Sequence, residues 1–167
     1  DEFPDIDKFK LFNGNLTVFK QVMFYFKLNL RVRNFDHDSG DGLWPGTRML
    51  NFRLFKKINN VQKIRNFKAK KYGWWRFDKP RLNIINYGGW HFRFFGSSKN
   101  LKHELENRSI GRGENILSTY SESDINNIIK NRLPFTTEEE RYEVYPLSKM
   151  PDFVKLNKER YSDSLII

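Results

Sequence analysis

Apolar residues recur at spacings of three and four between positions 16 and 30. This spacing is typical of one face of an α-helix, and it predicts a helix over 16–30. A second stripe at spacing four consists of Gln21, Tyr25 and Asn29. These side chains form either a hydrogen-bonded buried edge or an edge that faces a ligand.

Shorter apolar patterns predict strands further along the chain. Apolar and polar residues alternate over 49–55, which predicts a strand there. Leu82, Ile84 and Ile85 predict a second short strand directly before the stretch 86–96. That stretch joins two adjacent glycines to Trp90, His91 and a run of aromatic residues. We expect it to be a strand that leads into a functional site.

The remaining patterns predict short helices. Residues 56–72 indicate a basic amphipathic helix or a loop, and a helix is expected over 97–107. Ser121 and Asp124 have the form of a capping box at the start of another helix. Pro151 predicts a helix start, and we expect the C-terminal 165–167 to pack against the body. The sequence therefore predicts one α/β domain over 1–167, a mixed sheet with flanking helices.

Composition and charge narrow the choice of partners. Sixteen Phe, seven Tyr and four Trp predict a core built largely from aromatic rings. Zero Cys excludes disulfides and zinc-thiolate sites, and the sequence contains neither a transmembrane run nor a signal peptide. The net charge of +10 favours an anionic partner, whether nucleic acid, a phosphorylated nucleotide or a membrane surface, although lysines also serve solubility alone.

The positive charge is concentrated in residues 45–81, where Asp78 is the sole acid. Within this region, 72–77 places Tyr, Trp and Phe rings beside Arg76. Rings interleaved with cations are typical of surfaces that bind single-stranded nucleic acid, and also of the rim of a sugar or nucleotide site.

Two acidic segments are candidate cation sites. The first is 1–7, where clustered carboxylates either hold a divalent cation or form a frayed terminus. The second is the loop 34–42 with Asp36, His37, Asp38 and Asp41, whose spacing does not match an EF-hand. This loop either binds a cation or is simply solvated.

The order Gly-Gly-Trp-His-Phe-x-x-Phe-Gly at 88–96 resembles the hallmark of a glycosyltransferase family. This family includes the β-1,4-mannosyl-glycoprotein β-1,4-N-acetylglucosaminyltransferase and its microbial and viral relatives. Weaker matches follow in the family's order over nearly the whole chain: Asp1-Glu2-Phe3-Pro4, Gln21 with Tyr25 and Leu28-Asn29, Trp44 with Gly46-Thr47-Arg48, Pro80-Arg81, and Tyr145-Pro146-Leu147 through Pro151, Asn157 and Tyr161.

The resemblance implies an enzyme with the C-terminal part of a GT-A-like fold. It would transfer a sugar, expected to be GlcNAc, from a UDP-sugar to a hydroxyl of a glycan or glycoprotein, with inversion and with Mn²⁺ or Mg²⁺. The chain starts inside the family's acidic motif, so we expect the nucleotide-binding N-terminal half to lie upstream, and activity to depend on it. The resemblance implies the cytoplasm for a microbial or viral member and the Golgi lumen for a eukaryotic one.

The resemblance also implies roles for individual residues. Asp1 and His91 would bind the metal, with His91 alternatively bonding a phosphate, and Glu2 would be the catalytic carboxylate or support the metal site. Donor binding falls to Gly88, Gly89, Trp90, Arg48 and Arg93. The general base stays open among Asp36, Asp38, Asp41 and Glu104.

The chain departs from the family in one further respect, because 107–120 lacks the Ser-His-Thr-Glu run, for which His103-Glu104 is a displaced candidate. Two other functions therefore stay open. One is a non-catalytic basic aromatic module that binds single-stranded nucleic acid, and the other is an inactive relative that keeps the fold.

Overall fold

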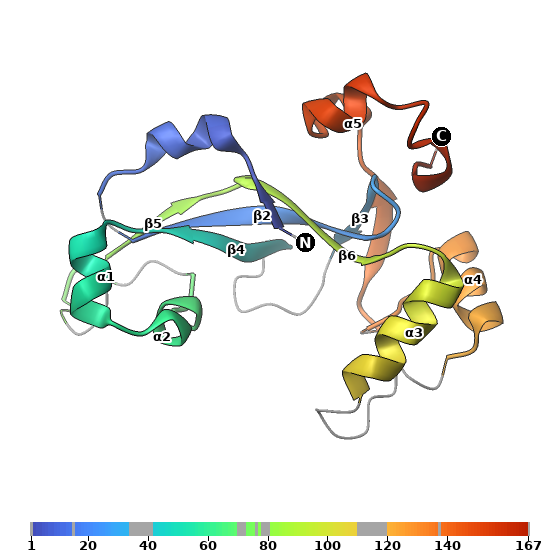
Figure 1. The fold of residues 1–167 in the computed structure, drawn as a ribbon, viewed down its shortest axis with the longest axis horizontal. Helices are drawn as coiled ribbons and strands as arrows, with labels where there is room; N and C mark the ends of the chain where they lie inside the picture. The colour runs from blue at the N-terminus through green and yellow to red at the C-terminus, as the bar shows by residue number, and fades with distance from the viewer. Residues whose placement is uncertain are drawn as a thin grey trace. The chain divides into compact units, whose positions relative to one another are not determined.

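The computed structural model (Figure 1) describes residues 2–14, 16–33, 42–69, 73–75, 77, 81–109, 120–136 and 138–166, with side chains of the helix ending at 109 described to 106. In this part of the chain, strands pair in the order β1-β6-β2-β3-β7, and β4 and β5 also pair with β2. The sheet is mixed, because β5 runs parallel to β2 whereas β4 runs antiparallel to it. The predicted α/β class with a mixed sheet and helices is therefore confirmed.

The chain divides into two compact units. One contains Asp1–Val22 and His37–His91, and the other contains Met23–Asp36 and Phe92–Ile167. Within the described residues, no helix combines the length and the apolar character needed to cross a membrane.

The central strand β2 (Leu16–Phe26) replaces the helix predicted over 16–30, so that prediction was wrong. All eleven of its residues are buried. A strand that is covered on both faces has no alternation of apolar and polar residues, and a nearly continuous apolar run contains helical spacings by chance. The β-branched and aromatic residues of this segment were the better indication of a strand.

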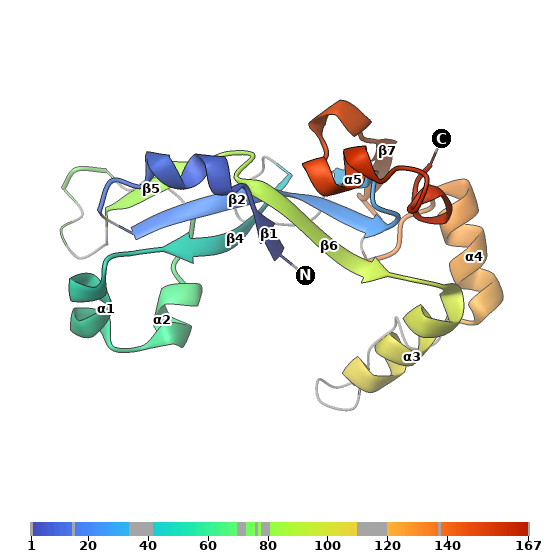
Figure 2. The ribbon, with the colours of Figure 1, turned by 45° about the horizontal axis from the view of Figure 1, so that its top comes forward.

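The first unit is built around the start of β2. It contains β1 (Glu2–Pro4), η1 (Ile6–Leu11), β4 (Leu43–Met49), α1 (Phe52–Ile58), α2 (Val61–Arg65), β5 (Leu82–Ile85) and the start of β6 (Gly89–Phe95). Figure 2 shows η1 on one side of this part of the sheet and the α1–α2 pair on the other. The Phe9 ring of η1 packs edge-on against Phe19 of β2, with 5.3 Å between centroids.

The three strand predictions that begin in this unit have different outcomes. The strand predicted over 49–55 was wrong, because β4 ends at Met49 and α1 occupies 52–58. Asn51 accepts a hydrogen bond from the amide of Leu54 at 2.7 Å and starts that helix. The strands predicted at Leu82–Ile85 and within 86–96 are confirmed by β5 and β6.

The core of the second unit consists largely of aromatic rings, as the composition predicts. Its elements are β3 (Leu30–Arg33), β7 (Arg141–Val144), α3 (Ser98–Ser109), α4 (Glu122–Asn131), η3 (Leu147–Lys149), α5 (Asp152–Leu156) and η4 (Ser162–Ser164). Tyr25 meets Phe94 edge-on at 5.0 Å between centroids, and Phe24 stacks with Phe92 at 5.3 Å. Helices α3 and α4 lie side by side. The predicted helix over 97–107 and the capping box at Ser121 are confirmed.

The C-terminus is tied to the β2–β3 turn by the buried side chain of Asn29. This amide donates to the carbonyl of Ile166 and accepts from its N–H, both at 2.8 Å. Leu165 is buried beside it. The predicted packing of the C-terminus is confirmed for these residues, whereas Ile167 lies outside the described part. Asn29 therefore belongs to a satisfied buried edge, one of the two alternatives left open for its stripe.

A fully buried carboxylate organises the turn before β7. Glu140 accepts hydrogen bonds from the amides of Phe135 and Thr136 at 3.0 Å, from the Thr136 hydroxyl, and from the Tyr142 hydroxyl at 2.8 Å. Burial raises the pKa of Tyr142, and the Glu140 charge adds to this shift. The phenol is therefore held protonated and donates to the carboxylate.

Replacing this carboxylate should destabilise the protein strongly. In Glu140→Ala the buried donors of Phe135, Thr136 and Tyr142 lose their acceptor, which costs about 3 kcal/mol and lowers Tm by about 6–12 °C. Thermal unfolding followed by circular dichroism measures this loss. The exposed neighbour in Glu139→Ala is the control, expected to change stability by less than about 0.5 kcal/mol. Equal melting of the two variants would contradict the role of Glu140.

The cap of α4 predicts a pH dependence of stability. Hydrogen bonds from the side chain and backbone of Ser121 lower the pKa of Asp124. Because the folded pKa lies below the unfolded one, this contribution is complete above the unfolded pKa and disappears as pH falls through the folded pKa. The destabilisation caused by Ser121→Ala should therefore be larger at neutral pH than in acid. Urea unfolding at a series of pH values measures it, and a pH-independent penalty would argue against the capping interaction.

Candidate functional site

Two motifs that are far apart in the sequence pair as neighbouring strands. Strand β1 lies antiparallel to β6, with Glu2 opposite His91 and Phe3 opposite Trp90. Partners directly opposite each other in a sheet project to the same face. Glu2 and His91 therefore share one face, and Phe3 and Trp90 share the other.

The adjacent glycines make this pairing possible. A Cβ at Gly89, whose φ is +146°, would lie 2.8 Å from the Cα of Pro4 in β1. A Cβ at Gly88 would lie 2.8 Å from the Cβ of Phe19 in β2. Real side chains do not fit at these distances. The space at both glycines is thus occupied by the protein's own strands, and the donor binding that the resemblance implies for Gly88 and Gly89 stays a prediction.

A bulge in β4 brings two more side chains to this face. Lys20 pairs with Pro45 and Val18 with Arg48, so Gly46 and Thr47 of β4 lie opposite a single residue of β2. In a regular strand, side chains three residues apart point to opposite faces. The extra residue resets this alternation, and as a result Trp44 and Thr47 both reach Glu2.

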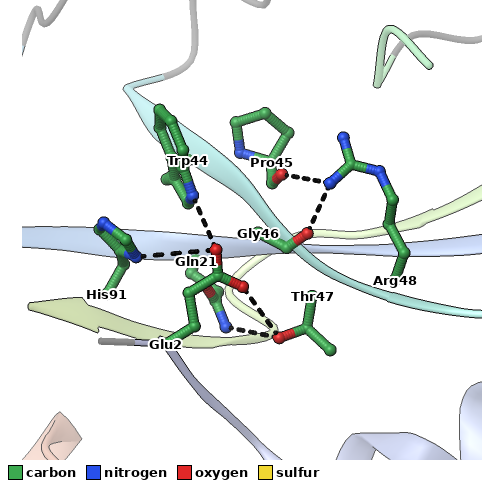
Figure 3. Close-up of polar contacts among 8 residues, drawn as sticks. All are labelled: Glu2, Gln21, Trp44, Pro45, Gly46, Thr47, Arg48 and His91. Carbon is green, nitrogen blue, oxygen red and sulfur yellow. Dashed lines mark hydrogen bonds and ion pairs between the residues drawn. The ribbon is translucent and has the colours of Figure 1, made fainter. Parts of the chain in front are cut away.

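Glu2 is the centre of the resulting cluster (Figure 3). Its Oε1 accepts from the indole Nε1 of Trp44 at 3.3 Å, and its Oε2 accepts from the Thr47 hydroxyl at 3.2 Å. His91 Nδ1 lies 3.9 Å from Oε1, and the imidazole stacks on the Trp44 ring at 5.2 Å between centroids. The Glu2 side chain is 38% exposed and that of His91 13%. The carboxylate is thus oriented by two donors and still reaches solvent.

Gln21 forms the floor of the cluster. It is fully buried on β2, and its Nε2 lies 3.3 Å from the Thr47 Oγ1. Its Oε1 has no hydrogen-bond partner among the described residues. A Cβ at Gly46 would lie 2.6 Å from the Gln21 Cδ and 3.1 Å from the Glu2 Oε2, so only glycine leaves room for both side chains. Gln21 therefore belongs to the candidate site and lies on the central strand β2, not on the predicted helix.

Arg48 stabilises the bulge in β4 by hydrogen bonds to its carbonyl groups. Its guanidinium donates to the carbonyls of Pro45 and Gly46 at 2.9 and 2.8 Å, and to the carbonyl of Phe67 at 3.3 Å. Burial lowers the pKa of Arg48, which the Glu2 charge partly offsets. Arginine nevertheless stays charged at physiological pH. The bond to Phe67 connects β4 to the segment after α2, whereas the other two stay within β4. The donor binding that the resemblance implies for Arg48 stays a prediction.

The other predicted site residues have different positions. Trp90 projects to the face opposite His91, beside Phe3. Arg93 belongs to the second unit, with its guanidinium 4.6 Å above the Phe94 ring. Glu104 also lies in that unit, on α3. The predicted residues that lie outside the described part are Asp1, Asp36, His37, Asp38, Asp41, Tyr72 and Arg76.

Sequence reasoning did not assign Trp44, Thr47 or Gln21 to the site. All three appeared as parts of the weaker family matches, and Gln21 also belonged to the polar stripe that was left open as an edge that faces a ligand. The available signal was Gly46 between Trp44 and Thr47, since a glycine inside a strand marks a bulge or a close approach.

The donor set of this face is compatible with a divalent cation. A carboxylate oxygen and an imidazole nitrogen from neighbouring strands lie 3.9 Å apart, and both are ligands for Mn²⁺-like ions. Bonds of about 2.0–2.2 Å from one ion would span that separation. Within the described residues, no group of three or more His, Cys, Asp and Glu is placed to hold a metal. A third protein ligand is expected from Asp1.

The packing at Gly46 gives a direct test of this geometry. Gly46→Ala should displace the Gln21 amide and cost about 1–3 kcal/mol of stability, as overpacking does. Shortening the displaced side chain should relieve the clash, so Gln21→Ala should cost less in the Gly46→Ala background than alone. Urea unfolding of the four proteins measures this coupling, and strictly additive costs would contradict the arrangement.

Comparison of the chain with models of protein families, with curated proteins and with solved structures finds no match in any of the three. The geometry of Glu2, His91 and Trp44 is therefore the ground for any statement about function, and the glycosyltransferase resemblance stays a prediction.

Proposed function

We propose that the chain is the C-terminal part of a GT-A-like, inverting glycosyltransferase that uses a UDP-sugar. The sugar is expected to be GlcNAc, and the acceptor a hydroxyl of a glycan or glycoprotein. The observation that carries the proposal is the pairing of Glu2 with His91, because the resemblance assigns these two residues to one catalytic site. They are 89 positions apart in numbering and lie opposite each other in the sheet.

The chemistry of such a transfer suits the groups on this face. When bound, a divalent cation would offset the charge of the leaving diphosphate. Glu2 and His91, with Asp1, would hold it. The Trp44 indole and the Thr47 hydroxyl fix the rotamer of Glu2 before any ligand arrives, and such preorganisation avoids reorganisation during the reaction.

Trp44 has a second role in this proposal. Its ring stacks on the imidazole of His91, which limits rotation of that side chain and keeps Nδ1 toward Glu2. A fixed imidazole binds a cation or a phosphate oxygen without losing further rotamer entropy. The buried Gln21 closes the floor of the cluster, and Thr47 adds a hydroxyl group of the kind that binds sugar hydroxyls.

Binding of nucleotide and metal tests the proposal without requiring full activity. UDP with Mn²⁺ should raise Tm by about 2–5 °C at tenfold excess over the dissociation constant. The gain should disappear with a chelator and in His91→Ala, and should persist in His103→Ala, whose side chain is exposed on α3. Differential scanning fluorimetry measures these shifts.

The same titrations separate the alternatives. A module that binds single-stranded nucleic acid would gain stability from oligonucleotides, with a steep dependence on salt, and gain none from UDP-sugars. An inactive relative that keeps only the fold would respond to neither ligand. If UDP-sugars leave Tm unchanged with and without Mn²⁺, the transferase function fails for this chain.

A further inference from the structure

The α1–α2 segment carries a concentrated positive charge. We call Phe52–Lys68 the basic helical surface; its exposed cations are Arg53, Lys56, Lys57, Lys63, Arg65 and Lys68. From Leu43 to Phe77 the sequence contains no Asp or Glu. No acidic residue in the same stretch therefore neutralises the cations of this surface, and the segment attracts anions.

The same surface exposes apolar side chains. Phe52 is 67% exposed and Val61 60%, and no residue of α1 is buried although four of its seven are apolar. Six positions after Lys68, Trp74 and Trp75 are 79% and 64% exposed. Within α1 and α2, an exposed ring and an exposed aliphatic group among exposed cations distinguish this surface from one that is charged only for solubility.

The basic helical surface is folded and anchored. Asn51 caps α1, and Asn60 caps α2 by accepting from the amide of Lys63 at 2.8 Å. Ile64 is the buried residue of α2. The Arg48 guanidinium bonds the carbonyl of Phe67 and so links the end of the segment to β4. The exposed cations therefore belong to helices that are capped and linked to the sheet.

We propose that the basic helical surface, with Trp74 and Trp75, docks the protein on an anionic phospholipid membrane. Short helices with exposed apolar groups among Lys and Arg place those groups at the boundary of headgroups and acyl chains, while the cations meet lipid phosphates and carboxylates. Trp is favoured at this boundary because its ring is amphipathic. The inference does not depend on the proposed transferase function.

Single-stranded nucleic acid fits this surface less well. The Phe52 ring is stacked on Phe55 at 6.2 Å between centroids and carries Lys56 at 4.9 Å from its centre, so a stacking base would compete with both groups for the ring faces. Val61 has no ring to offer for stacking. Both groups gain by insertion between lipid headgroups, where apolar area alone is favourable.

Sedimentation with lipid vesicles tests the proposal on the full chain. The protein should bind vesicles of phosphatidylcholine with phosphatidylserine and bind pure phosphatidylcholine weakly. Reversing two charges in Lys56→Glu/Lys57→Glu should weaken this binding roughly tenfold or more. The matched control is Lys158→Glu/Arg160→Glu, which changes the net charge equally at exposed positions of the second unit and should leave most of the binding intact.

Two further measurements test the contribution of the apolar side chains and the contact of the tryptophans with lipid. Phe52→Ser/Val61→Ser keeps every charge and should reduce the vesicle binding that survives at high salt, where headgroup attraction is screened. Tryptophan fluorescence should shift to the blue on vesicle binding, and circular dichroism confirms that each variant is folded. Absence of vesicle binding, equal loss in the control variant, or binding of an oligothymidine in place of vesicles would each overturn the proposal.

Discussion

The candidate site depends on one constraint, which is that positions 88 and 89 are glycines and carry no side chain. They let β1 and β2 approach the start of β6 so closely that a Cβ at either position would overlap a neighbouring strand. This contact sets the register in which Glu2 lies opposite His91. A shift by one residue would place Phe3 opposite His91 and turn the carboxylate to the other face. The register at the site is therefore specified by backbone packing and does not depend on the polar contacts.

Polar contacts orient the side chains that this register brings together. The bulge at Gly46 and Thr47 directs Trp44 and Thr47 to the same carboxylate, and it also frees carbonyl groups. Arg48 satisfies two of these carbonyls, so one side chain stabilises the irregularity that the site requires. The same bulge in β4 therefore orients Glu2, through Trp44 and Thr47, and is itself stabilised by Arg48.

The features that could be predicted from the sequence were the local ones. The capping box at Ser121 and the strand at Leu82–Ile85 depend on neighbours in the chain, and both were predicted. The central strand was mistaken for a helix because burial on both faces removes the period of two. The bulge in β4 has a local signal in Gly46, but its register is a product of pairing with β2, which local pattern does not encode. Proximity of Glu2 and His91 was implied by the family resemblance and not by periodicity.

The central claim is that the face shared by Glu2 and His91 binds a divalent cation, and the three histidines of the chain allow a direct test. Paramagnetic Mn²⁺ broadens the NMR signals of nearby imidazoles, so a titration of the ¹⁵N-labelled protein reports which histidine is closest to the ion. The account predicts that the ring signals of His91 broaden first and that those of His103 persist. First broadening at His37, within the acidic loop 34–42, or equal broadening of all three would contradict it.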